Sequence, residues 1–111
     1  MQTVLNEIST VQLEKTQEIL QVMADKYSRD ILSTTQDAPK SALKLAQETG
    51  IPISTVYRRI QRLHYNKLVK VSGEVTHEGK KHFLYQSKVK AILSKMIGDF
   101  ITVEIVPNPS H

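Results

Sequence analysis

The chain has no cysteine and no tryptophan, and only two phenylalanines and four glycines among its 111 residues. Without cysteine, disulfides and thiolate metal sites are excluded. No apolar run approaches the roughly 20 residues that a membrane-spanning helix needs, and the amino terminus lacks a basic segment followed by an apolar one. These absences predict a cytoplasmic protein with no membrane partner, and the length suits a single domain over residues 1–111.

Positive charge is concentrated in the middle of the chain. Residues 40–90 hold 11 lysines and arginines against three glutamates, whereas the whole chain carries a net charge of +4. A basic segment of this kind is the electrostatic footprint of a protein that binds a polyanion. Composition alone leaves open the alternative of a solvated basic surface without a partner.

The sequence shows no pattern typical of catalysis or metal binding. It has no Gly-rich phosphate loop and neither a Ser-x-x-Lys nor a Gly-x-Ser-x-Gly nucleophile motif. The histidines have no partner at i, i+4 spacing and no adjacent pair of carboxylates: His64, His77, His82 and His111. We therefore expect no enzymatic activity, no metal site and no cofactor.

The most informative stretch is SALKLAQETGIPISTVYRRIQRL, residues 41–63. It predicts a first helix over 41–49, a left-handed Gly50 that ends it, and a second helix over 53–65. One side of the second helix is apolar, with Val56, Ile60 and Leu63. The other side carries hydroxyl, aromatic, amide and guanidinium groups, from Ser54, Thr55, Tyr57, Arg58, Gln61 and Arg62. Arg59 lies on the flank between the two sides.

This polar side suits the major groove of DNA, because arginine forks pair with guanine edges and phosphates while hydroxyls bond to either. The spacing fits a helix-turn-helix in which the second helix reads the bases. Ser41 is predicted to cap the first helix, whose free N–H groups would meet a phosphate. For the arginines the alternative is exposed helix charge, and for Tyr57 it is packing beside the following hairpin.

Two helices are predicted before this motif. The first covers 11–24, with Ser9 or Thr10 as its cap. Asp25 caps the second, over 26–34. The first helix is apolar on more than one side, which favours two neighbours.

A β-hairpin is predicted after the motif. Asn66 takes a left-handed conformation at the helix end, and period-two alternation gives strands over 68–76 and 81–86, joined by a turn over 77–80. A hairpin that follows a helix-turn-helix is a wing. Its tip presents basic side chains to a DNA backbone or minor groove: His77, Lys80 and Lys81.

The end of the chain predicts a last helix over 88–98, because its apolar residues recur at i, i+3, i+4, i+7 and i+8. In the tail, 99–111, residues 100–106 alternate and suit a short strand. A domain this small cannot cover both terminal helices, so we expect a homodimer with helices 11–24 and 88–98 at its interface. The predicted interface residues are Leu13, Leu20, Met23, Val89, Ile92, Leu93, Met96 and Ile97.

In its order of elements the chain resembles the winged helix-turn-helix regulators of the ArsR type. The segments that carry the resemblance are VMADKYSRDIL, SALKLAQETGIPISTVYRRIQRLHYNKLVK and EGKKHFLYQ. It covers about residues 11–97 and implies an α+β, mainly α fold, in which residues 26–86 form a three-helix core and wing between dimerisation helices. It also implies a homodimeric transcriptional regulator whose second motif helix faces the groove. Metal-sensing members use a cysteine pair, which this chain lacks.

The sequence therefore predicts a dimeric transcription regulator that binds double-stranded DNA. One alternative is a winged-helix module for protein interactions, which the basic recognition helix disfavours. Another is a non-specific architectural DNA-binding protein, although hydroxyl and amide groups beside the arginines favour base reading.

Overall fold

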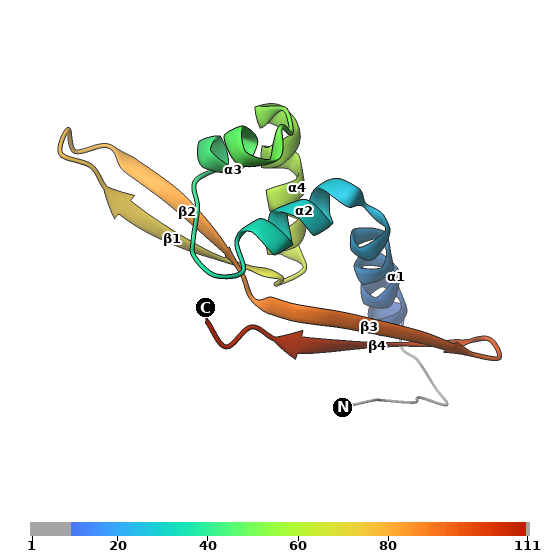
Figure 1. Ribbon diagram of the computed structural model, residues 1–111. Coiled ribbons are helices and arrows are strands. Elements are labelled where there is room, and N and C mark those ends of the chain that lie inside the picture. Colours follow the sequence, from blue (N-terminus) through green and yellow to red (C-terminus); the bar gives the residue numbers. More distant parts are fainter. Residues whose placement is uncertain (1–9, 111) are drawn as a thin grey trace.

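The computed structural model describes residues 10–110, with four helices followed by two β-hairpins (Figure 1). The helices are α1 (Thr10–Ala24), α2 (Lys26–Thr34), α3 (Ala42–Thr49) and α4 (Ile53–Tyr65). The strands are β1 (Val69–Val75), β2 (Lys81–Ser87), β3 (Val89–Ile97) and β4 (Phe100–Pro107). The molecule is elongated, 55 × 24 × 23 Å, because the two hairpins extend in opposite directions from the helices.

The four helices begin and end within a residue of their predicted bounds, because the local signals act as expected. The Asp25 carboxylate accepts a hydrogen bond from the Ser28 backbone N–H at 3.0 Å and caps α2. Ser41 Oγ accepts from the Lys44 N–H at 3.1 Å and caps α3. Gly50 ends α3 with φ 76°. The predicted Ser9 cap of α1 lies outside the described residues.

The turn that leaves α4 corrects one prediction. Asn66 has φ −87°, and the left-handed residue is Lys67, with φ 61°. Asn66 ends the helix through its side chain instead, since its Nδ2 donates to the Arg62 carbonyl at 2.9 Å and to Glu18 at 3.2 Å. Asn66 is buried, and these bonds fix its backbone. The left-handed conformation falls on the next residue, Lys67, which is exposed.

The core lies between α1, α2, α3 and α4 and the base of both hairpins. Its members come from every helix, from β1 and from the start of β3. The apolar side predicted for α4 faces this core: Val56, Ile60 and Leu63 are buried. The core therefore fixes the rotation of α4 about its own axis, which decides which side chains reach solvent.

The first hairpin, β1–β2, is antiparallel, with Val69 paired to Ser87 and Val75 to Lys81. The predicted wing is confirmed. Lys40, in the loop before α3, adds a two-sided bridge to the wing: its N–H donates to the Tyr85 carbonyl at 3.0 Å and its carbonyl accepts from the Tyr85 N–H at 2.8 Å. The base of the wing is thus tied to the helix-turn-helix.

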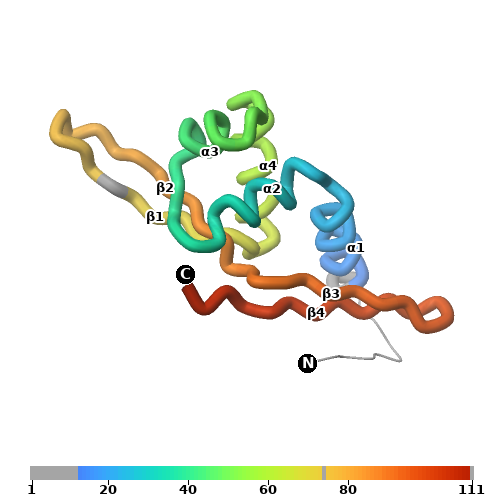
Figure 2. Tube along the Cα trace, in the orientation of Figure 1, coloured from blue at the N-terminus to red at the C-terminus, as the bar shows by residue number. Residues whose placement is uncertain are grey.

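The last predicted helix is wrong, because residues 89–97 form strand β3. Strand β2 continues into β3 past Lys88 alone, as Figure 2 shows, and β3 pairs antiparallel with β4. Gly98 and Asp99 make a two-residue turn between the paired Ile97 and Phe100, with Gly98 at φ 57°. A Gly-Asp pair between two apolar runs is a hairpin signal, and it outweighs the helical spacing of the apolar residues. The strand predicted over 100–106 is confirmed as β4.

Buried polar groups hold the base of the second hairpin on the segment that follows α2. The Ser87 N–H donates to the Thr35 carbonyl at 3.2 Å and to Thr35 Oγ1 at 3.0 Å. After β4, Asn108 Nδ2 donates to the Gln36 carbonyl at 2.7 Å and to the Ser87 carbonyl at 2.9 Å. The predicted tail is therefore an integral part of the fold. Within residues 10–110, none of the helices is both long and apolar enough to cross a membrane.

Candidate nucleic-acid interface

Helix α4 presents a continuous polar surface to solvent. Ser54, Tyr57, Arg58 and Gln61 are exposed, and Thr55 is half-buried. In the part of the chain that the structure describes, neither the Arg58 guanidinium nor the Gln61 amide has a hydrogen-bond partner. Both groups are therefore available to an incoming ligand. This is the arrangement that the sequence predicts for these five residues.

Tyr65 belongs to the same surface, although the sequence reasoning missed it. Its side chain is 81% exposed. It follows Gln61 at i+4 and so continues the row that begins with Ser54 and Arg58. The helical spacing was the signal that could have found it. A tyrosine here adds a phenol and a flat apolar ring at the carboxyl end of the polar surface.

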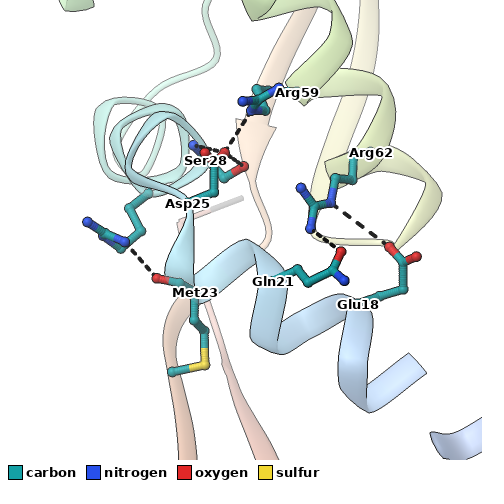
Figure 3. Close-up of polar contacts among 8 residues, drawn as sticks. Glu18, Gln21, Met23, Asp25, Ser28, Arg59 and Arg62 are labelled. Atoms are coloured by element: carbon teal, nitrogen blue, oxygen red, sulfur yellow. Dashed lines mark hydrogen bonds and ion pairs between the residues drawn. The ribbon is translucent and has the colours of Figure 1, made fainter. Parts of the chain in front are cut away.

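Arg59 and Arg62 are turned away from this row and hold α4 against the first two helices (Figure 3). Arg59 Nε donates to the Asp25 carboxylate at 2.7 Å, and its guanidinium lies 5.7 Å from the centre of the Tyr27 ring. Arg62 donates to Gln21 Oε1 at 2.8 Å and lies 4.0 Å from Glu18. The sequence predicts one DNA-binding role for Arg58, Arg59 and Arg62. In the structure Arg58 is exposed, whereas Arg59 and Arg62 bind side chains of the same chain.

The electrostatics of Asp25 agree with these contacts. Burial by itself would raise the pKa of its carboxyl group. The hydrogen bonds from Ser28 and Arg59, together with the positive charge of Arg59, outweigh burial and hold the pKa below its usual value. Asp25 is therefore charged at neutral pH and is both a helix cap and an ion-pair partner.

At the base of the wing, Tyr85 of β2 is half-buried. Burial raises the pKa of the Tyr85 phenol, and neighbouring Tyr57 adds to the effect. Tyr57 is still half exposed. Tyr57 therefore lies near Tyr85 and is open to solvent, and its contact with a phosphate or base stays a prediction.

The tip of the wing carries the predicted basic side chains. A turn bonded from Thr76 to Lys80 exposes His77 and Lys80, and Gly79 takes φ 77° within it. Lys81 is also exposed, but its ammonium group lies 5.2 Å from the centre of the Phe83 ring. The three residues are thus placed at or next to the tip, some distance from α4 along the hairpin.

The amino-terminal end of α3 is occupied by its own cap. Ser41 is half-buried and bonded to the Lys44 N–H. Lys40 forms an ion pair with Glu48, and this contact, with a lesser part from Lys44, lowers the pKa of the Glu48 carboxyl group. Two lysines are thus partly neutralised beside the point where Ser41 is predicted to meet a phosphate.

The predicted dimer residues divide into two groups. Leu13, Leu93, Met96 and Ile97 are exposed, and Met96 is 73% exposed. Val89 is buried in the core of its own chain, and Ile92 packs against that core. Leu20 and Met23 on α1 are half-buried. The hairpin also exposes three apolar side chains that the sequence reasoning did not select: Phe100, Ile101 and Ile105.

Metal ligands are not clustered in the described part of the chain. No group of three or more histidine, aspartate or glutamate side chains there could hold an ion. His64, His77 and His82 are all exposed and lie on different elements. His111 lies outside the described residues.

A three-helix core, a bridge to a basic hairpin and an exposed polar helix define a winged helix-turn-helix, as predicted. Residues 23–72 match a protein family described as a helix-turn-helix domain. This match spans α2, α3, α4 and the start of the wing, and ends before the second hairpin. No relative was found among curated proteins.

Two solved structures have a similar fold. One is the homodimeric winged helix-turn-helix DNA-binding domain Mb0332 from Mycobacterium bovis, a possible ArsR-family transcriptional regulator. It is 19% identical, and the similarity covers 75% of each chain with a TM-score of 0.59. The other is NolR from Sinorhizobium fredii, 19% identical over 78% of this chain and 84% of that chain, with a TM-score of 0.58.

Proposed function

We propose that this chain is a DNA-binding transcriptional regulator of the ArsR-like winged helix-turn-helix type, that it works as a homodimer in the cytoplasm, and that it has no enzymatic activity. The observation that carries the proposal is the polar row on α4, in which Ser54, Arg58 and Gln61 face solvent opposite a buried apolar side. A helix in this setting can enter the major groove without disturbing the core.

The roles of the α4 residues follow from their surroundings. Arg58 and Gln61 read base edges, because a guanidinium fork suits guanine and a side-chain amide suits adenine. Ser54, Thr55, Tyr57 and Tyr65 bind phosphates or bases around them. Arg59 and Arg62 act indirectly, by fixing the angle of α4 against α1 and α2.

The wing and α3 supply contacts to the backbone. His77, Lys80 and Lys81 bind phosphates or the minor groove beside the recognition helix, which gives affinity that depends on salt. Beside Ser41, the backbone N–H groups of α3 that the cap leaves free meet a further phosphate. These contacts set the position of the protein on DNA and leave the choice of sequence to α4.

The dimer forms through the second hairpin and α1 rather than through two terminal helices. A two-stranded hairpin is marginal by itself in water, and β3–β4 exposes apolar side chains on both of its faces: Leu93, Ile97 and Phe100 on one, and Met96, Ile101 and Ile105 on the other. Helix α1 packs on β4 only in part. A two-fold axis at this hairpin would place the same patch of each subunit against the other.

The test is selection and sequencing of random duplex DNA bound by the full chain, repeated at two salt concentrations. A dimeric reader enriches a two-fold symmetric motif, with half-sites about 34–36 Å apart. Salt-sensitive binding without enrichment would replace this function with an architectural one. Absence of binding at low salt would point to a module for protein interactions.

A further inference from the structure

A groove lies between the end of α1, helix α2 and strand β3. Its volume is about 350 Å³, which is within the range of about 300–1,000 Å³ typical of small-molecule sites. Val22, Leu32, Val89 and Ile92 give it apolar walls. Two of these residues belong to the buried core and two pack on it, so the walls are held in place.

Two cations stand at this groove, Arg29 on α2 and Lys90 on β3, and no acidic residue is among the described residues that line it. The Arg29 guanidinium donates one hydrogen bond, at 2.7 Å, to the carbonyl of Met23. A guanidinium has five N–H donors, so this bond orients the side chain while donors remain for a ligand. An apolar cleft with a cation on each side is complementary to a molecule that has an apolar body and a negatively charged group.

We propose that this groove binds a small carboxylate with a short apolar body, such as a single ring or a short chain. The carboxylate pairs with the Arg29 fork, which matches its geometry, and Lys90 adds a second charge. The apolar body packs on Leu32, Ala91 and Ile92, which line the groove and are partly exposed. The volume, at the low end of the range for such sites, suits a small molecule.

The position of the groove would couple a ligand to both parts of the proposed regulator. Met23, whose carbonyl orients Arg29, lies two residues before Asp25, which binds Arg59 of α4. The opposite wall is β3, which continues into the exposed apolar hairpin. A ligand that contacts both Arg29 and β3 therefore touches the segment next to Asp25, which holds α4, and the strand that leads into the proposed dimer surface.

The experiment is a titration of the isotope-labelled full chain, without DNA, with benzoate and with its neutral analogue benzamide, followed by NMR. We expect saturable shifts at the backbone amides of residues 22–36 and 89–92, with benzoate at least about tenfold tighter than benzamide. Because no DNA is present, the result is independent of the proposed function.

Two variants locate the site. Arg29→Gln should weaken benzoate about tenfold and leave benzamide unchanged. The control Lys15→Gln, at an exposed cation of α1 that does not line the groove, should change neither. Ser33→Leu, at an exposed position of α2 on the rim, fills the groove and should weaken both probes.

Three results would overturn the proposal. The first is benzoate shifts spread over all basic surfaces without saturation. The second is equal benzoate affinity in Arg29→Gln and in the wild type. The third is that neither probe shifts the amide signals of the groove, while the same signals shift when the protein is diluted. That result would mean that a second copy of the chain covers the groove.

Discussion

Arg59 donates a hydrogen bond from Nε to the carboxylate of Asp25 at 2.7 Å, and the same carboxylate caps α2. One acidic side chain thus holds the start of α2 and the middle of α4 together. Neither charge is fully exposed, with 29% of the Arg59 side chain and 21% of the Asp25 side chain accessible. The angle between α2 and α4 depends on this pair as well as on the core.

Replacing Asp25 should therefore cost more stability than an exposed ion pair would. Asp25→Ala removes the cap and the pair, and we expect the free energy of unfolding to fall by about 2 kcal/mol. Asp25→Asn keeps a good cap and loses only the charge, so about half of that loss is expected. Urea unfolding measures both values. Equal stability of the alanine variant and the wild type would contradict the role given to this residue.

The same pair predicts how stability depends on pH. The folded-state pKa of Asp25 lies below its usual 3.8. Its charge therefore stabilises the fold fully above that value, and the contribution is lost as the pH falls through the folded pKa. The stability difference between the wild type and Asp25→Asn should be constant from neutral pH to about pH 5 and shrink below about pH 4. A difference that already shrinks between pH 7 and pH 5 would contradict this.

Arg58 and Arg59 are adjacent in sequence but should behave differently when each is replaced by alanine. Arg58→Ala should weaken specific DNA binding by about 1–3 kcal/mol and relax the preference at one base pair, with little change in stability. Arg59→Ala should lower stability by about 1–3 kcal/mol, because it leaves the partly buried Asp25 unpaired. Fluorescence anisotropy with the selected operator, beside urea unfolding, separates the two effects. Identical profiles would refute the division of roles.

The wing should contribute through charge rather than through base recognition. Replacing Lys80 and Lys81 together by alanine should reduce the slope of log K against log salt by about 2, with the preferred sequence unchanged. Lys15→Ala, at an exposed lysine of α1, is the control and should leave the slope as it is. An unchanged slope in the double variant would remove the wing tip from the interface.

The second hairpin should control assembly. Met96→Asp places a charge on an exposed apolar side chain of β3, and we expect it to convert a dimer to a monomer in sedimentation equilibrium. Leu43→Asp, at an exposed leucine of α3, is the matched control and should remain dimeric. If Met96→Asp is still a dimer, the interface lies elsewhere.

Much of the helix-turn-helix could be predicted because its signals are local. Asp25 and Ser41 cap helices by bonds to residues three positions on, and Gly50 ends α3 through its own φ. The buried stripe on α4 follows from helical spacing. The sequence by itself therefore determined the four helices, the wing and the exposed row of α4.

Only the tertiary structure decided the rest. The apolar spacing of residues 89–97 suits a helix or a strand, and a strand forms because its partner, β4, lies across a Gly-Asp turn and is tied back by Asn108. The arginines of α4 differ only in what lies opposite them. Asp25 and Gln21 are far from Arg59 and Arg62 in the sequence. Packing of the helices was therefore needed to show that these two guanidinium groups are bound, whereas Arg58 has no partner among the described residues.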